Sequence, residues 1–175
     1  MYVRSAAWWL PGAGGEGGAL MTGPVVRESV TLAGRAERAR AARAFLGAVL
    51  GPGHPCRDDA ALLVGELFGN SVRHSRSGAP GGTVTVAVRA GDGLVRVEVT
   101  DRGGPEVPEL DAAGRDAEGG RGLQLVAALA VRWGWRRRGG RTVTWFELCD
   151  LLQPMQHFAV SGMGVNSPDV RLSGL

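Results

Sequence analysis

Five stretches of the chain carry the residue pattern of β-strands. They are rich in β-branched residues or alternate between hydrophobic and polar positions, which is typical of strands in a sheet with one buried face. The five stretches are residues 25–32, 83–89, 94–100, 131–137 and 141–148. Asp92 and Gly93 separate the second stretch from the third, and Gly139 and Gly140 separate the last two. The second and third strands, and likewise the fourth and fifth, are therefore predicted to form hairpins.

Three further stretches are predicted to be helices. They cover approximately residues 35–50, 58–74 and 122–130. The first combines arginines on one side with apolar residues on the other, and Gly51 and Pro52 end it. The second is expected to begin near Asp58, whose carboxylate can cap free backbone N–H groups.

The order of these elements predicts an α+β fold. A strand, two helices, a hairpin, a loop, a helix and a second hairpin imply a two-layer α/β sandwich. Its sheet would be mixed but mostly antiparallel, with about three helices covering one face. The predicted organisation is a flexible leader, a single domain and a disordered tail, at residues 1–24, 25–150 and 151–175. Gly12, Gly14 and Gly17 match GxGxxG formally, but no strand precedes them and no amphipathic helix follows.

Composition indicates one soluble globular domain. A length of 175 residues leaves no room for a second full domain, and 44% hydrophobic residues are sufficient for a core. The sequence pI of about 9.6 is weak evidence for nucleic-acid binding, because every basic residue except histidine is an arginine and no long basic run occurs. The cluster of Arg136, Arg137, Arg138 and Arg141 is typical of a solvated face or of a contact with phosphate or an acidic partner.

Neither the cysteines nor the N-terminal residues indicate secretion. Cys56 and Cys149 lie far apart, which suggests a reduced compartment and no disulfide framework. The apolar patch at residues 6–10 is too short for a signal peptide or a membrane span. We therefore expect a cytoplasmic protein without a membrane partner.

Three polar or glycine-rich signals stand where a plain core would not place them. Glu66 and Asn70 are spaced i, i+4 in the second helix and project from one face, although a solvated pair would look the same. Asp101 ends an apolar strand and precedes Gly103 and Gly104, so a carboxylate lies beside backbone that a ligand can approach; an ordinary turn also explains this. The third signal is a glycine loop at the start of an apolar helix, at residues 119–126. The N–H groups of such a helix start favour binding of phosphate oxygens, although a simple helix entry would look the same.

The three signals together resemble the N, G1 and G2 boxes of the gyrase, histidine kinase and MutL superfamily. The corresponding segments are Glu-Leu-Phe-Gly-Asn-Ser-Val-Arg-His-Ser at 66–75, Asp-Arg-Gly-Gly-Pro at 101–105 and Gly-Arg-Gly-Leu-Gln-Leu-Val at 120–126. The resemblance covers about residues 25–149 and implies the Bergerat-type ATP-binding fold. The segment between the second and third boxes is short, as it is in the anti-sigma factor serine kinases and in particular in their small actinobacterial members.

The resemblance implies a role for each matching residue. Glu66 would activate the attacking hydroxyl, and Asn70 would coordinate Mg²⁺ beside ATP. Asp101 would accept a hydrogen bond from the adenine amino group, and Gly103 would let the base approach the backbone. The third box would bind the phosphates and would contribute Gly120, Arg121, Gly122 and Leu123 to the nucleotide site. His74 and Arg121 are further candidates for positions near the phosphates. The alternatives are that His74 caps its helix and that Arg121 is a solvated side chain.

The resemblance also implies function and partners. The chain would be an ATP-binding anti-sigma factor with serine/threonine kinase activity, which sequesters a sigma factor and phosphorylates a STAS-type anti-anti-sigma protein. A homodimer is suggested in the same way. Pro105 departs from the superfamily pattern, which often has glycine there, and puts turnover more in doubt than adenine binding. The alternatives are a non-catalytic ATP-dependent binding module and a regulator that binds DNA directly.

Overall fold

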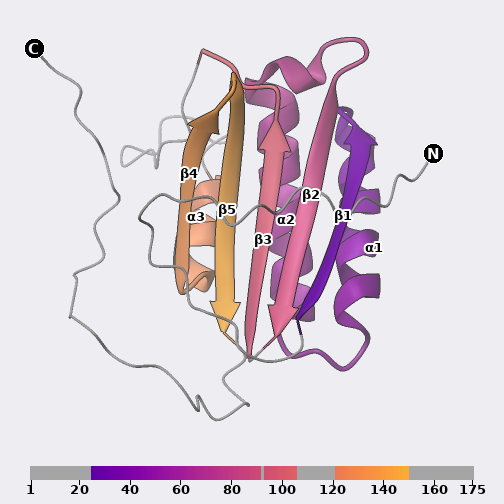
Figure 1. Cartoon of the computed structure of the whole chain (residues 1–175), viewed down its shortest axis with the longest axis vertical. Helices are drawn as coiled ribbons and strands as arrows, with labels where there is room; N and C mark the ends of the chain where they lie inside the picture. The colour runs from indigo at the N-terminus through magenta and orange to yellow at the C-terminus, as the bar shows by residue number, and fades with distance from the viewer. Residues whose placement is uncertain (1–24, 92, 106–120, 150–175) are drawn as a thin grey trace, which may run out of the picture.

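A five-stranded antiparallel sheet forms one layer of the protein. The computed structural model describes residues 25–91, 93–105 and 121–149. The strands are β1 (Val26–Ala33), β2 (Thr83–Gly91), β3 (Leu94–Asp101), β4 (Arg132–Arg138) and β5 (Arg141–Cys149). They lie in the order β1-β2-β3-β5-β4, and β3 is therefore the central strand (Figure 1).

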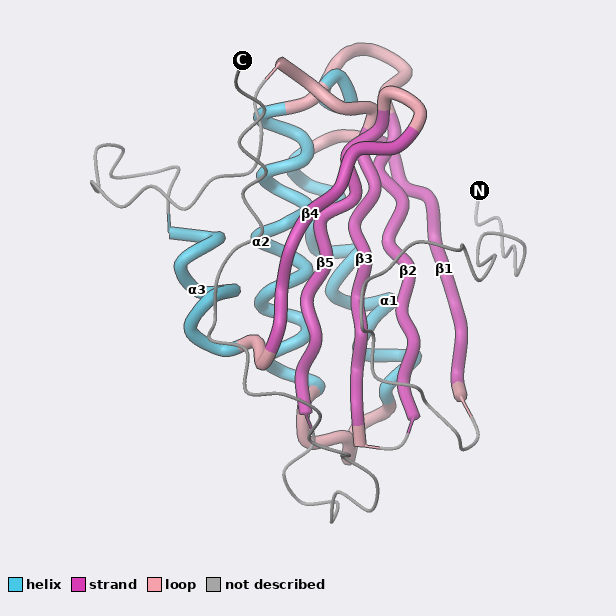
Figure 2. The backbone as a smooth tube through the Cα atoms, turned by 60° about the vertical axis from the view of Figure 1, so that its left-hand side comes forward, coloured by secondary structure: helices cyan, strands magenta, loops and turns pink. Residues whose placement is uncertain are grey.

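The helices form the second layer on one face of this sheet (Figure 2). They are the short 3-10 helix η1 (Ala36–Arg38), α1 (Ala39–Leu50), α2 (Arg57–His74), the 3-10 helix η2 (Arg76–Gly78) and α3 (Arg121–Leu129). α2 lies between α1 and α3 and also packs on β3. Among the described residues, no helix combines the length and the apolar character that a membrane crossing requires.

The expected α+β sandwich is confirmed, with two corrections. All four pairings among the described strands are antiparallel, so the expected mixed sheet is wrong for this part of the chain. The second helix begins at Arg57, and Asp58 does not cap it. The turn before it supplies backbone contacts instead, because the Arg57 N–H donates to the carbonyl of His54. Asp58 lies within the first turn, where a carboxylate still favours the helix dipole.

The core lies between the sheet and the helices. β2 alternates strictly between buried and half-buried residues, and its buried valines Val84, Val86 and Val88 face the helices. α2 contributes Leu63 and Phe68, both without exposed surface. Burial of this apolar face supplies the main favourable free energy of folding and fixes α2 over the central strand.

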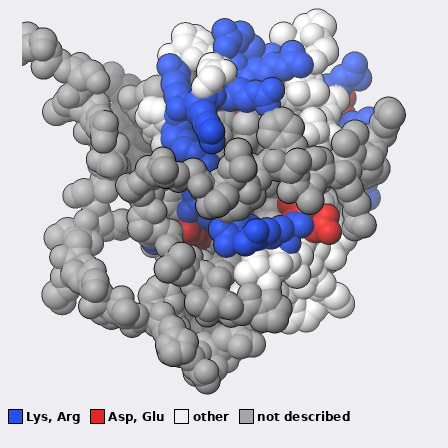
Figure 3. Space-filling model, viewed as in Figure 1, with Lys and Arg blue, Asp and Glu red and all other residues white. Residues whose placement is uncertain are grey.

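Two tight hairpins bring the ends of the strands together. Gly139 and Gly140 have φ values of +56° and +74°, which a two-residue turn matched to the twist of the sheet requires. Asp101, the last residue of β3, pairs with Thr142 near the start of β5. The end of β3 and the β4–β5 turn therefore lie at the same end of the molecule, where arginine side chains gather (Figure 3).

Charged side chains are paired on the face of the sheet away from the helices. The Arg96 guanidinium lies 2.7 Å from a Glu147 oxygen and 3.0 Å from a Glu98 oxygen. It also stacks on the Trp145 ring, 4.1 Å from the centroid, and the ring occupies the space above Gly134. Glu147 is 2% exposed, so its buried charge needs the opposite charge of Arg96 beside it.

Candidate functional site

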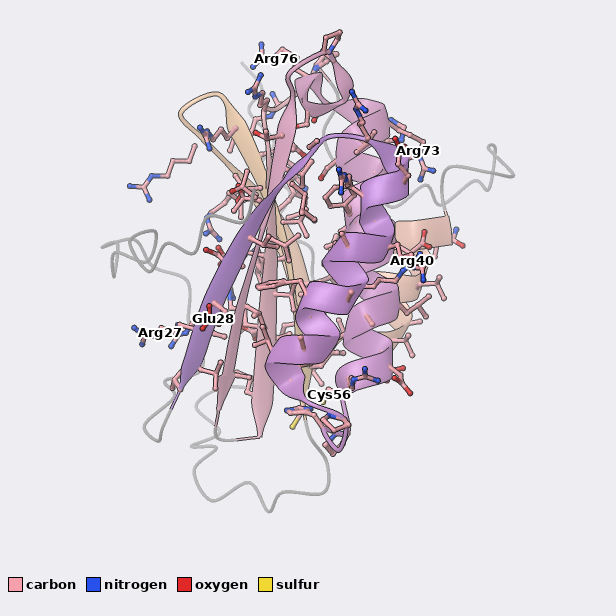
Figure 4. The ribbon with its side chains drawn as sticks, turned by 90° about the vertical axis from the view of Figure 1, so that its right-hand side faces the viewer. Arg27, Glu28, Arg40, Cys56, Arg73 and Arg76 are labelled. Carbon is pink, nitrogen blue, oxygen red and sulfur yellow. The ribbon has the colours of Figure 1, made fainter. Side chains whose placement is uncertain are left out.

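The three sequence signals meet at one end of the two-layer structure. Glu66 and Asn70 lie in α2, Asp101 ends β3, and Gly122 lies in the first turn of α3. α2 packs against both other elements and is therefore the element that links the three signals. Figure 4 shows Arg73 and Arg76 near the end of α2 where this site lies and Cys56 near the opposite end.

The first turn of α3 rests on the polar side of α2. A Cβ atom added to Gly122 would lie 3.0 Å from Glu66 Oε2 and 3.2 Å from Asn70 Nδ2. Gly122 is buried, whereas Glu66 and Asn70 are half-buried. The two polar side chains thus face a second helix start and are not a fully solvated pair, and glycine allows that close approach.

Asn70 carries a partner that the sequence interpretation did not identify. Arg73 Nη2 donates to Asn70 Oδ1 at 2.7 Å. The i, i+3 spacing was the available signal, since residues three apart lie on the same side of a helix. This contact orients the amide with its oxygen toward a positive charge.

Asp101 is a buried carboxylate that receives hydrogen bonds from three elements. Asp101 is 7% exposed, and its Oδ1 accepts a hydrogen bond from the Gly103 N–H at 2.6 Å. The Ser71 hydroxyl of α2 and the Thr142 N–H of β5 also donate to it. Burial raises the pKa of the Asp101 carboxyl, and these donors and the positive charge of Arg137 offset only part of that rise.

The glycines after Asp101 are required by the backbone around them. Gly103 has φ +63°, and a Cβ there would lie 2.5 Å from the carbonyl oxygen of Gly140 in the β4–β5 turn. A Cβ at Gly104 would lie 2.2 Å from the carbonyl oxygen of His74 at the end of α2. Sequence reasoning assigned Gly103 to the approach of a base, and this role stays a prediction beside the packing reason.

The third motif is only partly visible. Gly120 and the side chain of Arg121 lie outside the described residues, as do the predicted leader and tail. Leu123 is 9% exposed and belongs to the hydrophobic core, so only its backbone remains a candidate for ligand contact. The N–H groups in the first turn of α3 suit an anion, because the first N–H groups of a helix have no acceptor within that helix.

The donor set fits a nucleotide with a hard metal ion. A buried carboxylate that is already oriented suits a base amino group, while an amide oxygen and a carboxylate beside a helix N-terminus suit Mg²⁺ and phosphates. Within the described part of the chain, no group of three or more His, Cys, Asp or Glu residues could hold a metal by itself. Asn70 would therefore hold Mg²⁺ together with phosphate oxygens, and not within a cage of protein ligands.

Comparison with known proteins identifies similar domains. The family model described as a histidine kinase-like ATPase domain matches residues 32–148, which include Glu66, Asn70, Asp101 and Gly122. No curated protein compared with the chain matches it.

One solved structure is similar over most of the chain. It is the crystal structure of the RsbU and RsbW domains of Rv1364c from Mycobacterium tuberculosis, with a TM-score of 0.52 and 26% sequence identity. The match covers 73% of this chain but 32% of the other. This chain therefore spans about a third of the similar one.

Burial of Asp101 predicts a specific pH dependence of stability. Because its folded pKa lies above the ordinary carboxyl value, the contribution of Asp101 is fully present below the unfolded pKa and is lost as pH rises through the folded pKa. Between about pH 3 and about pH 7, the wild type should lose unfolding free energy relative to Asp101→Asn. Urea denaturation across this range measures the difference, with the exposed Asp59→Asn as the control for one lost carboxylate. A constant difference between wild type and Asp101→Asn would contradict the prediction.

The Gly103 contact predicts a second stability difference. Gly103→Ala and Gly139→Ala both place a side chain at a left-handed φ, but only Gly103 has backbone within 4 Å of the new Cβ. Gly139→Ala should cost about 1 kcal/mol of unfolding free energy for backbone strain alone. Gly103→Ala should cost about 3 kcal/mol, because the β4–β5 turn must also move. Equal shifts of the two urea midpoints would show that Gly140 does not restrict residue 103.

Proposed function

The chain belongs to the histidine kinase-like ATPase domain family, and on this basis we propose that it is an ATP-binding anti-sigma factor with serine/threonine kinase activity. It sequesters a sigma factor and phosphorylates a Ser or Thr of a STAS-type anti-anti-sigma protein. One observation carries the proposal: the first turn of α3 packs on Glu66 and Asn70 of α2, next to the strand that ends in Asp101. The similarity to a structure that contains an RsbW domain supports the choice of partners.

Asp101 binds the adenine base in this proposal. Three donors from α2, β5 and the following loop hold its carboxylate in place before any ligand arrives. A carboxylate has about four acceptor positions, so one remains for the adenine amino group. The low exposure of Asp101 strengthens this hydrogen bond, because water competes poorly for it.

The phosphates bind where α2 and α3 meet. The N–H groups at the start of α3 point along the helix axis, and the helix dipole favours negative charge there. The oxygen of Asn70 would supply one ligand to Mg²⁺ in place of its present hydrogen bond to Arg73, and the Arg73 guanidinium would help to offset phosphate charge.

Glu66 acts on the incoming hydroxyl. Bound ATP supplies the phosphoryl group. The Glu66 carboxylate accepts the proton of a Ser or Thr hydroxyl, the freed oxygen bonds to the γ-phosphorus, and ADP leaves with the electrons of the broken bond. Its contact with Gly122 holds this carboxylate next to the phosphate site.

A non-catalytic module that uses ATP only to stabilise a partner-binding surface is the second candidate. Two observations favour it: Arg73 already engages the oxygen of Asn70, and Pro105 stands where the superfamily often has glycine. Both features affect metal binding and loop movement more than base binding. Nucleotide binding without transfer would therefore be the outcome that supports this candidate.

Nucleotide affinities of three variants should form a pattern. Asp101→Asn should weaken ATP and ADP alike, with or without Mg²⁺, by about 5- to 150-fold, since a desolvated adenine donor loses its acceptor. Asn70→Ala should weaken mainly the Mg²⁺-dependent part of ATP binding. Glu66→Gln should stay within a few-fold of the wild type. Calorimetric titration measures all three, and equal small losses would mean that these are ordinary surface residues.

Phosphoryl transfer should depend on Glu66. With labelled ATP and candidate STAS-type proteins, Glu66→Gln should reduce transfer by about 10²- to 10⁴-fold while keeping nucleotide affinity. The matched control is Glu37→Gln, which removes one exposed carboxylate from η1. Transfer that is equal in wild type and Glu66→Gln would remove Glu66 as the base.

A further inference from the structure

The loop that follows Asp101 is enclosed by two parts of the protein that are distant in sequence. Gly104 lies against the carbonyl of His74 at the end of α2, and Gly103 lies against Gly140 in the β4–β5 turn. The carbonyl of Gly103 also accepts from the Arg76 N–H at 2.9 Å. Residues 102–105, called the G1 loop below, thus fill the space between α2 and the turn.

Arg76 binds this loop from the side of α2. Its Nε and Nη2 donate to the carbonyl oxygen of Arg102 at 3.1 and 2.8 Å. Its Nη2 also donates to the carbonyl oxygen of Gly140 at 3.2 Å. One guanidinium therefore joins the G1 loop to the β4–β5 turn, and it places two nitrogens on the carbonyl oxygen of Arg102, which the single nitrogen of a lysine could not do.

Arg137 binds the loop from the side of β4. Its Nη2 donates to the carbonyl oxygen of Gly104 at 2.8 Å and approaches that of Pro105 at 3.5 Å. Arg137 is also the charged residue that favours the ionised form of Asp101. The two arginines thus satisfy consecutive backbone carbonyls of the loop from opposite sides.

We propose that Arg76 and Arg137 are positioning residues for base recognition, a pair that clamps the G1 loop in the shape that aims the Asp101 carboxylate at the base. This inference rests on the proposed nucleotide site and adds two residues that contact neither base nor phosphate in it. The link is direct, since Oδ1 of Asp101 accepts from the N–H of Gly103 inside the clamped loop. A shift of the loop moves that donor and with it the orientation of the carboxylate.

The clamp explains why arginines occur at both positions. A loop with two adjacent glycines has high conformational entropy when free, so fixing it in one conformation costs free energy. Side-chain hydrogen bonds from the two arginines offset this cost. Hydrogen bonds from a charged guanidinium to carbonyl oxygens are stronger than those between neutral groups. Both side chains are exposed, so their main contribution is to orient the loop and not to support the core.

Adenosine, ADP and ATP binding to the full chain tests the clamp. Arg76→Gln and Arg137→Gln should each weaken all three ligands by a similar factor of about three to ten, because the base is their common part. Arg138→Gln is the matched control. It removes an exposed arginine from the same strand end, and Arg138 makes no side-chain hydrogen bond or ion pair to the described residues. Its affinities should stay within twofold of the wild type.

Two results of the binding experiment would overturn the clamp. Losses limited to ADP and ATP would show that the arginines contact phosphates directly. Recovery of adenosine binding by Arg76→Lys would show that only the positive charge matters, since lysine cannot place two nitrogens on the carbonyl oxygen of Arg102 as Nε and Nη2 do. The clamp predicts that Arg76→Lys binds adenosine as weakly as Arg76→Gln.

Hydrogen exchange tests the clamp without a nucleotide. In the ligand-free protein, the amide of Gly103 should exchange about tenfold faster in Arg76→Gln and Arg137→Gln than in the wild type or Arg138→Gln, because local opening becomes easier. Unchanged exchange would overturn the clamp whether or not the chain binds ATP. A wild type that binds none of the three ligands would instead refute the proposed function, and the exchange rates would still decide on the clamp.

Discussion

The arrangement of the candidate site depends most on the buried carboxylate of Asp101 at the end of β3. Removing an ionised group from water costs far more than a typical hydrogen bond returns, so Asp101 can lie there only if its surroundings supply donors. They come from three separate elements: Ser71 in α2, Thr142 in β5 and Gly103 in the next loop. The positions of α2, the end of the sheet and the G1 loop are therefore coupled through one side chain.

This coupling accounts for the glycines around the site. α2 and the β4–β5 turn must approach the G1 loop closely enough for the donors to reach Asp101, and backbone atoms then occupy the space of a Cβ at Gly103 and Gly104. The hydrophobic contact of α2 with β3 stabilises the whole arrangement, whereas the raised pKa of Asp101 reduces stability at neutral pH. Such a cost is typical of a site that is shaped for a ligand before the ligand binds.

The sequence predicted the architecture well, because each element had a local signal. Period-two alternation and turn glycines located the two hairpins, and the spacing of Glu66 and Asn70 predicted that they share one face of α2, which is the face that the start of α3 contacts. The contacts of Arg76 and Arg137 were not predictable in this way. Their acceptors are backbone carbonyls 26 to 64 residues away for Arg76 and 32 to 33 for Arg137, and a carbonyl oxygen has no residue-specific signature. The expected cap at Asp58 failed for a related reason, since backbone groups of the preceding turn took that role.

Pro105 acquires a different meaning once the loop geometry is known. From the sequence, a proline in place of the superfamily glycine suggested a stiffer or differently shaped hinge. The structure shows that Gly104, one position earlier, is the residue that must lack a side chain, because the carbonyl of His74 lies against it. Pro105 is exposed and its carbonyl faces Arg137, so its fixed φ restrains the last residue of the G1 loop. The departure thus agrees with the proposed base site, whose loop is restrained by its neighbours. The glycine stands one place earlier because the loop passes the carbonyl of His74 at Gly104.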